Sequence, residues 1–211
     1  MTKNTNDIIN GNKNNFQDDN ERKIILIMGM GINGIDARGW FSAEGMIGDV
    51  WDLLKTVDTF ILGRATFQEW ERTWPTRAKY ISENTTGNPI LDEFQINFSK
   101  LLDEIPKIVF SKTVKSVSWQ NSRVVNTEIS TEISRTKKLP GKNIAVVGGV
   151  GIVHTLTDLN LIDDYYLYIH PVIFGSGESI LGTPKTEVQL KLVESKDFGS
   201  DGIMLHFCPV R

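Results

Sequence analysis

The chain has 211 residues, enough for one well-packed domain and too few for two ordinary ones. Its composition, 40% hydrophobic and 23% charged, is that of a globular protein, and a net charge of −3 gives no reason to expect nucleic acid or a membrane surface as partner. No apolar run approaches the roughly 20 residues of a membrane span, and a signal peptide is not expected. The single cysteine, Cys208, and three scattered histidines predict no metal site. We therefore expect a cytoplasmic protein.

The first half of the chain predicts a tail followed by alternating strands and helices. Residues 1–21 contain seven asparagines and no apolar period, which predicts a disordered tail before a domain over residues 22–211. The expected elements are a strand buried on both faces at 24–28, a glycine-rich loop at 29–45, a helix at 46–57, a strand at 59–62, a short helix at 66–72, a polar loop or insertion at 75–88 and a helix at 91–103.

The second half continues the alternation and then changes character. The expected elements are strands at 107–110 and 123–125, a helix at 128–138, a strand at 144–147, a helix at 150–160, a long strand at 165–173 and two paired strands within 187–209 around residues 199–202. This order predicts a single α/β domain. Its sheet should be mixed and mainly parallel, flanked by helices, with an antiparallel hairpin at the C-terminal edge.

Two glycine motifs compete for the role of phosphate-binding turn. Gly29-Met30-Gly31-Ile32-Asn33-Gly34 matches the Rossmann pattern G-x-G-x-x-G, but the residues after it lack helical spacing and no ribose-binding acid ends the next strand. Gly148-Gly149-Val150-Gly151 lies between an apolar strand and a segment with helical spacing, the arrangement in which free amides and the helix dipole hold an anion. The second motif is therefore the stronger candidate, although a tight turn without a ligand remains an alternative.

Several segments together resemble the dihydrofolate reductase superfamily, in the branch of the riboflavin-biosynthesis reductase domain. The segments, in the family's order, are Gly63-Arg64-Ala65-Thr66, Pro106-Lys107-Ile108-Val109-Phe110-Ser111-Lys112-Thr113, Trp119-Gln120-Asn121, Val147-Gly148-Gly149, Leu161-Ile162-Asp163-Asp164 and Pro171-Val172-Ile173-Phe174-Gly175-Ser176-Gly177. The resemblance runs from about Lys23 to the C-terminus. It implies a dihydrofolate reductase-like fold and an NADPH-dependent oxidoreductase.

The resemblance also implies which residues bind the cofactor. Gly148 and Gly149, with Val150 and Gly151 at the start of the next helix, would hold the pyrophosphate. Gly63, Arg64 and Thr66 would reach the phosphates from the other side. Ser111 and Lys112 would flank the 2′-phosphate of NADPH, because a dianionic ester calls for a cation and a hydroxyl group. Two solvated surface charges are the alternative for Arg64 and Lys112.

The substrate side is less defined. Asn33 occupies the place of an aspartate in the family's S-L-D-G segment and cannot supply its negative charge. On a helical wheel, Asp49 lies at the boundary of the apolar face and is our candidate for the substrate-facing acid, whereas Asp52 should be solvated. Glu44 is a further candidate. Trp40, Phe41 and Trp51 could stack on a flat substrate but more often such residues cover a core.

Three functions follow as hypotheses. The first is a reductase of a small heteroaromatic (pterin- or pyrimidine-like) or carbonyl substrate, the second a nucleotide-binding module without catalysis, and the third a Rossmann dehydrogenase using residues 29–34. The deaminase of the bifunctional riboflavin enzyme is excluded, because the chain lacks its cysteines and its length. The resemblance further implies a homodimer formed through sheet edges, with the apolar strand 165–173 as a candidate interface.

Overall fold

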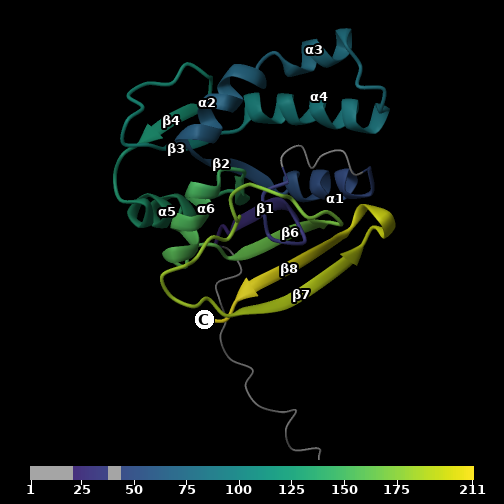
Figure 1. The fold of residues 1–211 in the computed structure, drawn as a ribbon. Coiled ribbons are helices and arrows are strands. Elements are labelled where there is room, and N and C mark those ends of the chain that lie inside the picture. The colour runs from purple at the N-terminus through teal and green to yellow at the C-terminus, as the bar shows by residue number, and fades with distance from the viewer. Residues whose placement is uncertain (1–20, 38–43) are drawn as a thin grey trace, which may run out of the picture.

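The computed structural model describes residues 21–37 and 44–211, which form an eight-stranded sheet covered by helices on both faces (Figure 1). The tail expected at 1–21 lies, apart from Glu21, outside the described residues. The strands are β1 (Ile24–Gly31), β2 (Val57–Gly63), β3 (Lys107–Phe110), β4 (Ser122–Val125), β5 (Asn143–Val147), β6 (Asp164–His170), β7 (Leu190–Asp197) and β8 (Ile203–Pro209). The helices are α1 (Glu44–Leu54), α2 (Arg64–Thr73), α3 (Arg77–Glu83), α4 (Pro89–Glu104), α5 (Ile129–Lys137), α6 (Val150–Asp158) and the short 3-10 helix η3 (Gly199–Asp201).

The strand order is β4-β3-β2-β5-β1-β6-β8-β7. All neighbours are parallel as far as β6, and β8 is antiparallel to both β6 and β7. The predicted fold class is thus confirmed, including the antiparallel hairpin at the C-terminal edge. One detail was wrong: β6 is paired on both sides, so it cannot be the edge through which two copies join. The edges are β4 and β7.

The core lies on both faces of the sheet because the central strands alternate apolar side chains between them. From β1, Ile25 and Ile27 join the cluster under α1, α2 and α4, while Leu26 and Met28 join the cluster under α5 and α6. All eight residues of β1 are buried. The continuous apolar run at 24–28 therefore forms a strand covered on both faces, as predicted.

The segment 75–88, predicted to be a loop, contains helix α3. Its polar composition hid the helix, whose stability comes from packing on α4 rather than from its own sequence. Ile81 is buried, and Arg77 Nε donates a hydrogen bond of 2.6 Å to Gln95 Oε1 on α4. In Figure 1 the two helices lie side by side above the sheet.

Three boundaries differ by three residues from those predicted. The first strand ends at Gly31 rather than 28. The first helix ends at Leu54 rather than 57, because Thr56 Oγ1 bonds the carbonyl of Leu53 and Val57 already belongs to β2. The long strand ends at His170 rather than 173, since Pro171 has no N–H to continue the ladder.

Two residues from the family-like segments, Lys107 and Trp119, stabilise the fold. Lys107, the first residue of β3, is fully buried, and its ammonium group bonds the carbonyls of Leu102 and Ile105 at the end of α4. It also lies 4.6 Å from the centre of the Trp119 ring, whose Nε1 donates to Asp103 Oδ1. These bonds join the end of α4 to the start of β3.

No helix within residues 21–37 and 44–211 has the length and apolarity needed to cross a membrane.

Candidate cofactor site

A cavity of about 340 Å³ lies at the carboxyl ends of the parallel strands. Its walls come from segments far apart in the sequence, and in a parallel sheet these strand ends meet at one edge. The lining residues are Gly63, Arg64, Ala65, Thr66, Phe110, Ser111, Lys112, Asn126, Thr127, Ile129, Gly149, Gly151, Ile152 and Thr155. The cavity thus collects seven of the nine predicted cofactor residues, all except Gly148 and Val150.

The turn between β5 and α6 brings the N-terminus of α6 to this cavity. Gly148 and Gly149 have φ of +74° and +82°, which side chains rarely tolerate, and Gly149 caps α6. A Cβ on Gly149 would lie 2.7 Å from Thr66 Oγ1, so the close approach of this turn to α2 also requires glycine. Two helices therefore begin at the cavity, α2 at Arg64 and α6 at Val150, and both present the positive end of a helix dipole.

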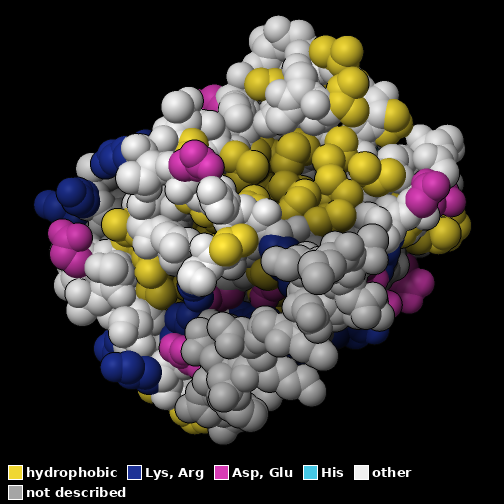
Figure 2. Space-filling view, turned by 90° about the horizontal axis from the view of Figure 1, so that it is seen from below, with side chains coloured by type: hydrophobic (Ala, Val, Ile, Leu, Met, Phe, Trp, Pro, Cys, Tyr) yellow, Lys and Arg dark blue, Asp and Glu magenta, His cyan; other side chains and the backbone are white. Residues whose placement is uncertain are grey.

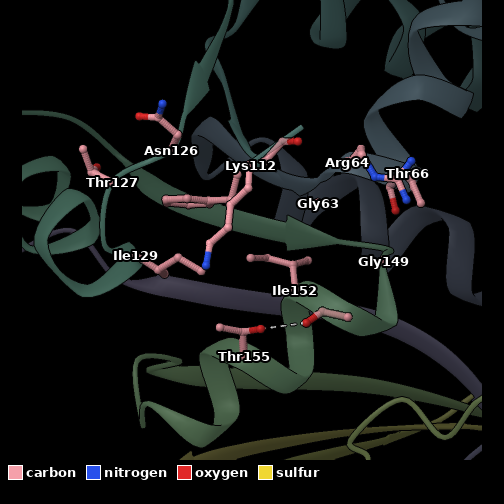
Figure 3. A pocket seen from close by; sticks show the side chains of 14 residues that line it. Gly63, Arg64, Thr66, Lys112, Asn126, Thr127, Ile129, Gly149, Ile152 and Thr155 are labelled. Carbon is pink, nitrogen blue, oxygen red and sulfur yellow. Dashed lines mark hydrogen bonds between the residues drawn. The ribbon is translucent and has the colours of Figure 1, made fainter. Parts of the chain in front are cut away.

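Two basic side chains line the cavity and lie apart from each other (Figure 3). Lys112 follows β3 and extends between Ile129 and Ile152, and within the described residues it forms no ion pair. Arg64 opens α2 beside Thr66, where its Nη1 bonds Gln68 Oε1 at 3.3 Å. The Ser111 hydroxyl oxygen accepts from the amides of Thr113 and Val114 and so shapes the turn that carries Lys112.

The other residues that line the cavity were not predicted from the sequence. Asn126 and Thr127 follow β4 and form the wall opposite α6, and Ile129, Ile152 and Thr155 contribute apolar surface from α5 and α6. The rule that parallel strands present their carboxyl ends at one edge would have found Asn126 and Thr127. No local motif marks Ile152 or Thr155, whose place depends on how α6 packs.

Within the described residues, the early glycine motif lacks the strand–turn–helix geometry of a Rossmann phosphate site. β1 continues through Gly31, a tight turn follows, and within residues 29–37 no helix begins. Instead the loop packs against the segment after β6: Ile32 N donates to Val172 O at 2.9 Å, and a Cβ on Gly31 would lie 2.6 Å from that same oxygen. Its glycines thus serve close packing, and the strand order also differs from that of a Rossmann sheet.

A second cavity, of about 230 Å³, adjoins the first turn of α6. Val150 lines it together with Asp36 from the loop after β1, and with Phe174, Ser176, Gly177 and Glu178 from the segment after β6. The first turn of α6 therefore touches both cavities, Gly149 and Gly151 lining one and Val150 the other.

The predicted substrate-side residues lie outside both cavities. Asp49 is largely buried: its Oδ2 accepts from the Tyr168 hydroxyl at 2.7 Å and its Oδ1 from Lys196 Nζ at 2.5 Å. This bond to Asp49 raises the pKa of Lys196, and burial raises that of Tyr168. The Asn33 amide bonds the backbone of Phe174.

The remaining candidates have structural partners as well. Asp52 is exposed, as expected, and pairs with Lys55. Glu44 Oε1 accepts from Asn88 Nδ2 at 2.8 Å. Trp51 packs edge-on against Phe94 at 6.1 Å between α1 and α4, whereas Trp40 and Phe41 lie outside the described residues.

The comparison with protein families decides the identity of the domain. The family model of the RibD C-terminal domain matches residues 33–204, most of the chain. The chain belongs to the RibD C-terminal domain family. The family resemblance inferred from the motifs is thereby confirmed.

Relatives and solved structures agree with this assignment. The chain is similar to the uncharacterized protein YyaP of Bacillus subtilis (strain 168), with 29% identity over 88% of this chain and 94% of that protein. The structure of the deaminase/5-amino-6-(5-phosphoribosylamino)uracil reductase of Thermotoga maritima matches with a TM-score of 0.61 and 14% identity, over 90% of this chain and 57% of that one. Dihydrofolate reductase from Enterococcus faecalis, complexed with NADP(H), matches with a TM-score of 0.53 and 14% identity, over 89% and 96%. At such low identity, the two structures show the shared fold.

Proposed function

We propose that this RibD-type domain is an NADPH-dependent reductase that transfers hydride to a small heteroaromatic or carbonyl substrate. The observation that carries the proposal is the 340 Å³ cavity, in which two helix N-termini, two basic side chains and a glycine turn converge. Amides at helix N-termini bind phosphate, and flanking cations neutralise its charge. When bound, NADPH would supply the hydride, while the protein orients the two reactants and excludes water.

The arrangement of residues favours NADPH over NADH. The pyrophosphate would lie on the amides of Gly149 and its neighbours, with Arg64 and Thr66 across from them. Lys112 lies away from Arg64, on the side of the cavity lined by Asn126 and Thr127, and would meet the 2′-phosphate of the adenosine half there. A cation without an ion pair in the described chain is what a dianionic ester requires.

A binding module without catalysis is the second candidate, and a specific observation favours it. The amide of Asn33 is occupied by Phe174, and both carboxylate oxygens of Asp49 accept bonds from Tyr168 and Lys196. Neither predicted catalytic residue therefore offers an uncommitted polar group. NADPH oxidation separates the two functions, because a binding module shows NADPH affinity without substrate-dependent turnover.

The cofactor proposal is tested by Lys112→Ala with Lys115→Ala as the matched control. Both lysines are exposed and lie on the same turn, but only Lys112 lines the cavity. Loss of a charge-assisted bond of about 1.5–3 kcal/mol should weaken NADPH binding roughly 10-fold to 100-fold and leave NADH binding unchanged. Equal losses for both cofactors, or the same loss in Lys115→Ala, would contradict the proposal. The measurement is NADPH fluorescence titration.

The substrate class is tested by following NADPH oxidation with dihydrofolate and with 5-amino-6-(5-phosphoribosylamino)uracil. These are substrates that the names of the structural relatives imply, and a reductase of this class should accelerate oxidation above the rate without acceptor. Tight NADPH binding with no acceptor-dependent oxidation by either compound, or by a wider panel of pyrimidines and carbonyls, would favour the binding module.

We further propose that the protein acts in the cytoplasm as a homodimer joined through the β7–β8 hairpin. Leu192, Val193 and Ile203 of this hairpin are exposed apolar residues. Figure 2, seen from the side on which β7 and β8 lie in Figure 1, has a broad group of hydrophobic side chains. Sedimentation should give twice the monomer mass, and Leu192→Glu should halve it.

A further inference from the structure

The two cavities differ in the sign of the charges that line them. Arg64 and Lys112 line the first cavity, and among the described residues no acid does. The second, of about 230 Å³, is lined by two acids, Asp36 and Glu178, and by the aromatic ring of Phe174, and no lysine, arginine or histidine of the described chain joins them. A carboxylate and the face of an aromatic ring both attract a cation. The second cavity is therefore suited to a small cationic group.

The ring of Phe174 is held against the end of β1. Asn33 Nδ2 donates to Phe174 O at 2.9 Å, and Phe174 N donates to Asn33 Oδ1 at 3.4 Å. A Cβ on Gly31 would lie 2.8 Å from Phe174 Cδ2, so a side chain at position 31 would displace the ring. The half-buried ring of Phe174 therefore has a fixed backbone and a place that glycine keeps open.

Backbone hydrogen bonds join the two segments that form this cavity, one after β1 and one after β6. Asp36 N donates to Glu178 O at 3.2 Å, and Ile180 N donates to Gly34 O at 2.9 Å. An isolated β-bridge pairs Ile35 with Ser179 between them. The fold thus fixes the walls of the cavity to each other, which lowers the entropic cost of ordering them around a ligand.

The start of α6 lies between the two cavities. Gly149 and Gly151 line the first cavity, and Val150 lines the second. In a dinucleotide, the pyrophosphate joins the adenosine half to the nicotinamide half. A pyrophosphate held at the start of α6 would therefore leave the adenosine half to the basic cavity and the nicotinamide half to the acidic one.

We propose that Phe174 and Glu178 stabilise the positive charge that the nicotinamide ring acquires when it gives up its hydride. The inference rests on the proposed reductase function. The C4–H bond of the dihydronicotinamide breaks, and its electron pair forms a C–H bond at the C=N or C=O carbon of the acceptor, whose nitrogen or oxygen takes a proton from water. The ring of NADPH is neutral and that of NADP⁺ is a cation, so the aromatic face and the carboxylate favour the oxidised ring and the transition state that leads to it.

The first experiment compares the two forms of the cofactor and needs no acceptor. NADP⁺ and NADPH are titrated separately against the full chain by calorimetry. Phe174→Leu and Glu178→Gln should each weaken NADP⁺ binding about threefold to 10-fold and leave NADPH binding within about twofold, because only the oxidised ring is charged. Phe174→Tyr keeps the aromatic face and should keep the wild-type difference between the cofactors. The effect of Glu178→Gln should shrink in about 1 M salt, since the carboxylate is exposed.

The controls are changes of the same kind outside both cavities. Glu187→Gln removes an exposed carboxylate from the segment after β6, and Ile173→Ala truncates the exposed neighbour of Phe174. Neither residue lines either cavity, so both variants should bind NADP⁺ and NADPH as the wild type does. Lys112→Ala should weaken both cofactors to the same extent, because both carry the 2′-phosphate.

The proposed function and this inference fail in different ways. If the wild type binds neither NADP⁺ nor NADPH, the reductase proposal falls and the inference falls with it. If it binds both, and Phe174→Leu or Glu178→Gln weakens them equally or not at all, only the inference about that residue is overturned.

The second experiment follows the charge as it develops in the reaction. With an acceptor that supports NADPH oxidation, Glu178→Gln should lower the single-turnover rate of hydride transfer about threefold to 10-fold without changing the affinity for NADPH. Glu187→Gln should keep the rate. An unchanged rate in Glu178→Gln would overturn the electrostatic role of this carboxylate.

Discussion

The two ends of the parallel sheet use charged residues in opposite ways. At the amino end, Arg22 is buried before β1 and donates to Asp58, to Thr59 Oγ1 and to Lys142 O. At the carboxyl end, within the described part of the chain, Lys112 forms no ion pair and Arg64 bonds only a neighbouring glutamine on its own helix.

The difference separates stability from binding. Charges buried at the amino end are matched by bonds within the protein, because an unpaired buried charge would be too costly. Exposed cations at the carboxyl end are hydrated, so they need no partner within the protein and can bind an anionic ligand. Changes at the amino end should therefore alter folding, and changes at the carboxyl end should alter cofactor binding.

The largest expected effect is that of Arg22→Met. Removing the guanidinium leaves the Asp58 carboxylate and the Thr59 hydroxyl without their shared donor, at a cost of about 3–5 kcal/mol in the free energy of unfolding. Urea denaturation measures the loss. NADPH affinity, measured where the variant is still folded, should not change. A loss below about 1 kcal/mol would show that the amino end does not depend on this residue.

Lys107→Met tests a pH-dependent contribution of the amino end. Burial lowers the pKa of Lys107 to about 8, from 10.5 when unfolded. The unfolded chain then binds more protons between these values, so stability rises with pH over this window, by about 3 kcal/mol in total. This gain in the free energy of unfolding is complete above pH 10.5 and absent below pH 8. Denaturation of both proteins at pH 7.5 and 10.5 gives the comparison, and a difference that stays constant would contradict it.

Gly149→Ala lies at the carboxyl end and should combine both kinds of effect. Its φ of +82° and the 2.7 Å approach of Thr66 Oγ1 to a Cβ would strain the turn by about 1–3 kcal/mol. The shifted amides should bind NADPH and NADH less well to the same extent. Gly48→Ala is the control, because a Cβ there meets nothing within 4 Å and Gly48 lines neither cavity. Equal behaviour of the two variants in cofactor titration would argue against a role for the turn.

The smallest expected effect is that of Arg64→Gln. An exposed guanidinium facing a pyrophosphate contributes about 1 kcal/mol, so affinity should fall about fivefold for NADPH and NADH alike. Stability should stay within 0.5 kcal/mol, roughly the range of surface substitutions. A selective loss of NADPH binding would place Arg64 at the 2′-phosphate and exchange its proposed role with that of Lys112.

Much of the fold could be predicted from the chain itself. The apolar runs of β1, β2 and β5 and the hairpin around residues 199–202 are local patterns with one physical solution each. Helix α3 could not be predicted, since its polar residues become helical only on the surface of α4. For the same reason, the place of Asp49 on its helix was correct, but its bonds to Tyr168 and Lys196 depend on strands more than a hundred residues away.

The two glycine motifs show what the sequence could determine and what depended on the tertiary structure. The sequence alone predicted a loop or turn at both, because glycine after a buried strand permits positive φ and close packing, although Gly29 and Gly31 belong to β1 and the turn follows them. Only the assembled sheet decided which of them faces a cavity: one turn is filled by the segment after β6, and the other opens α6 beside the ends of β2 and β3. Strand order sets that outcome, and it depends on contacts between segments that no local pattern contains.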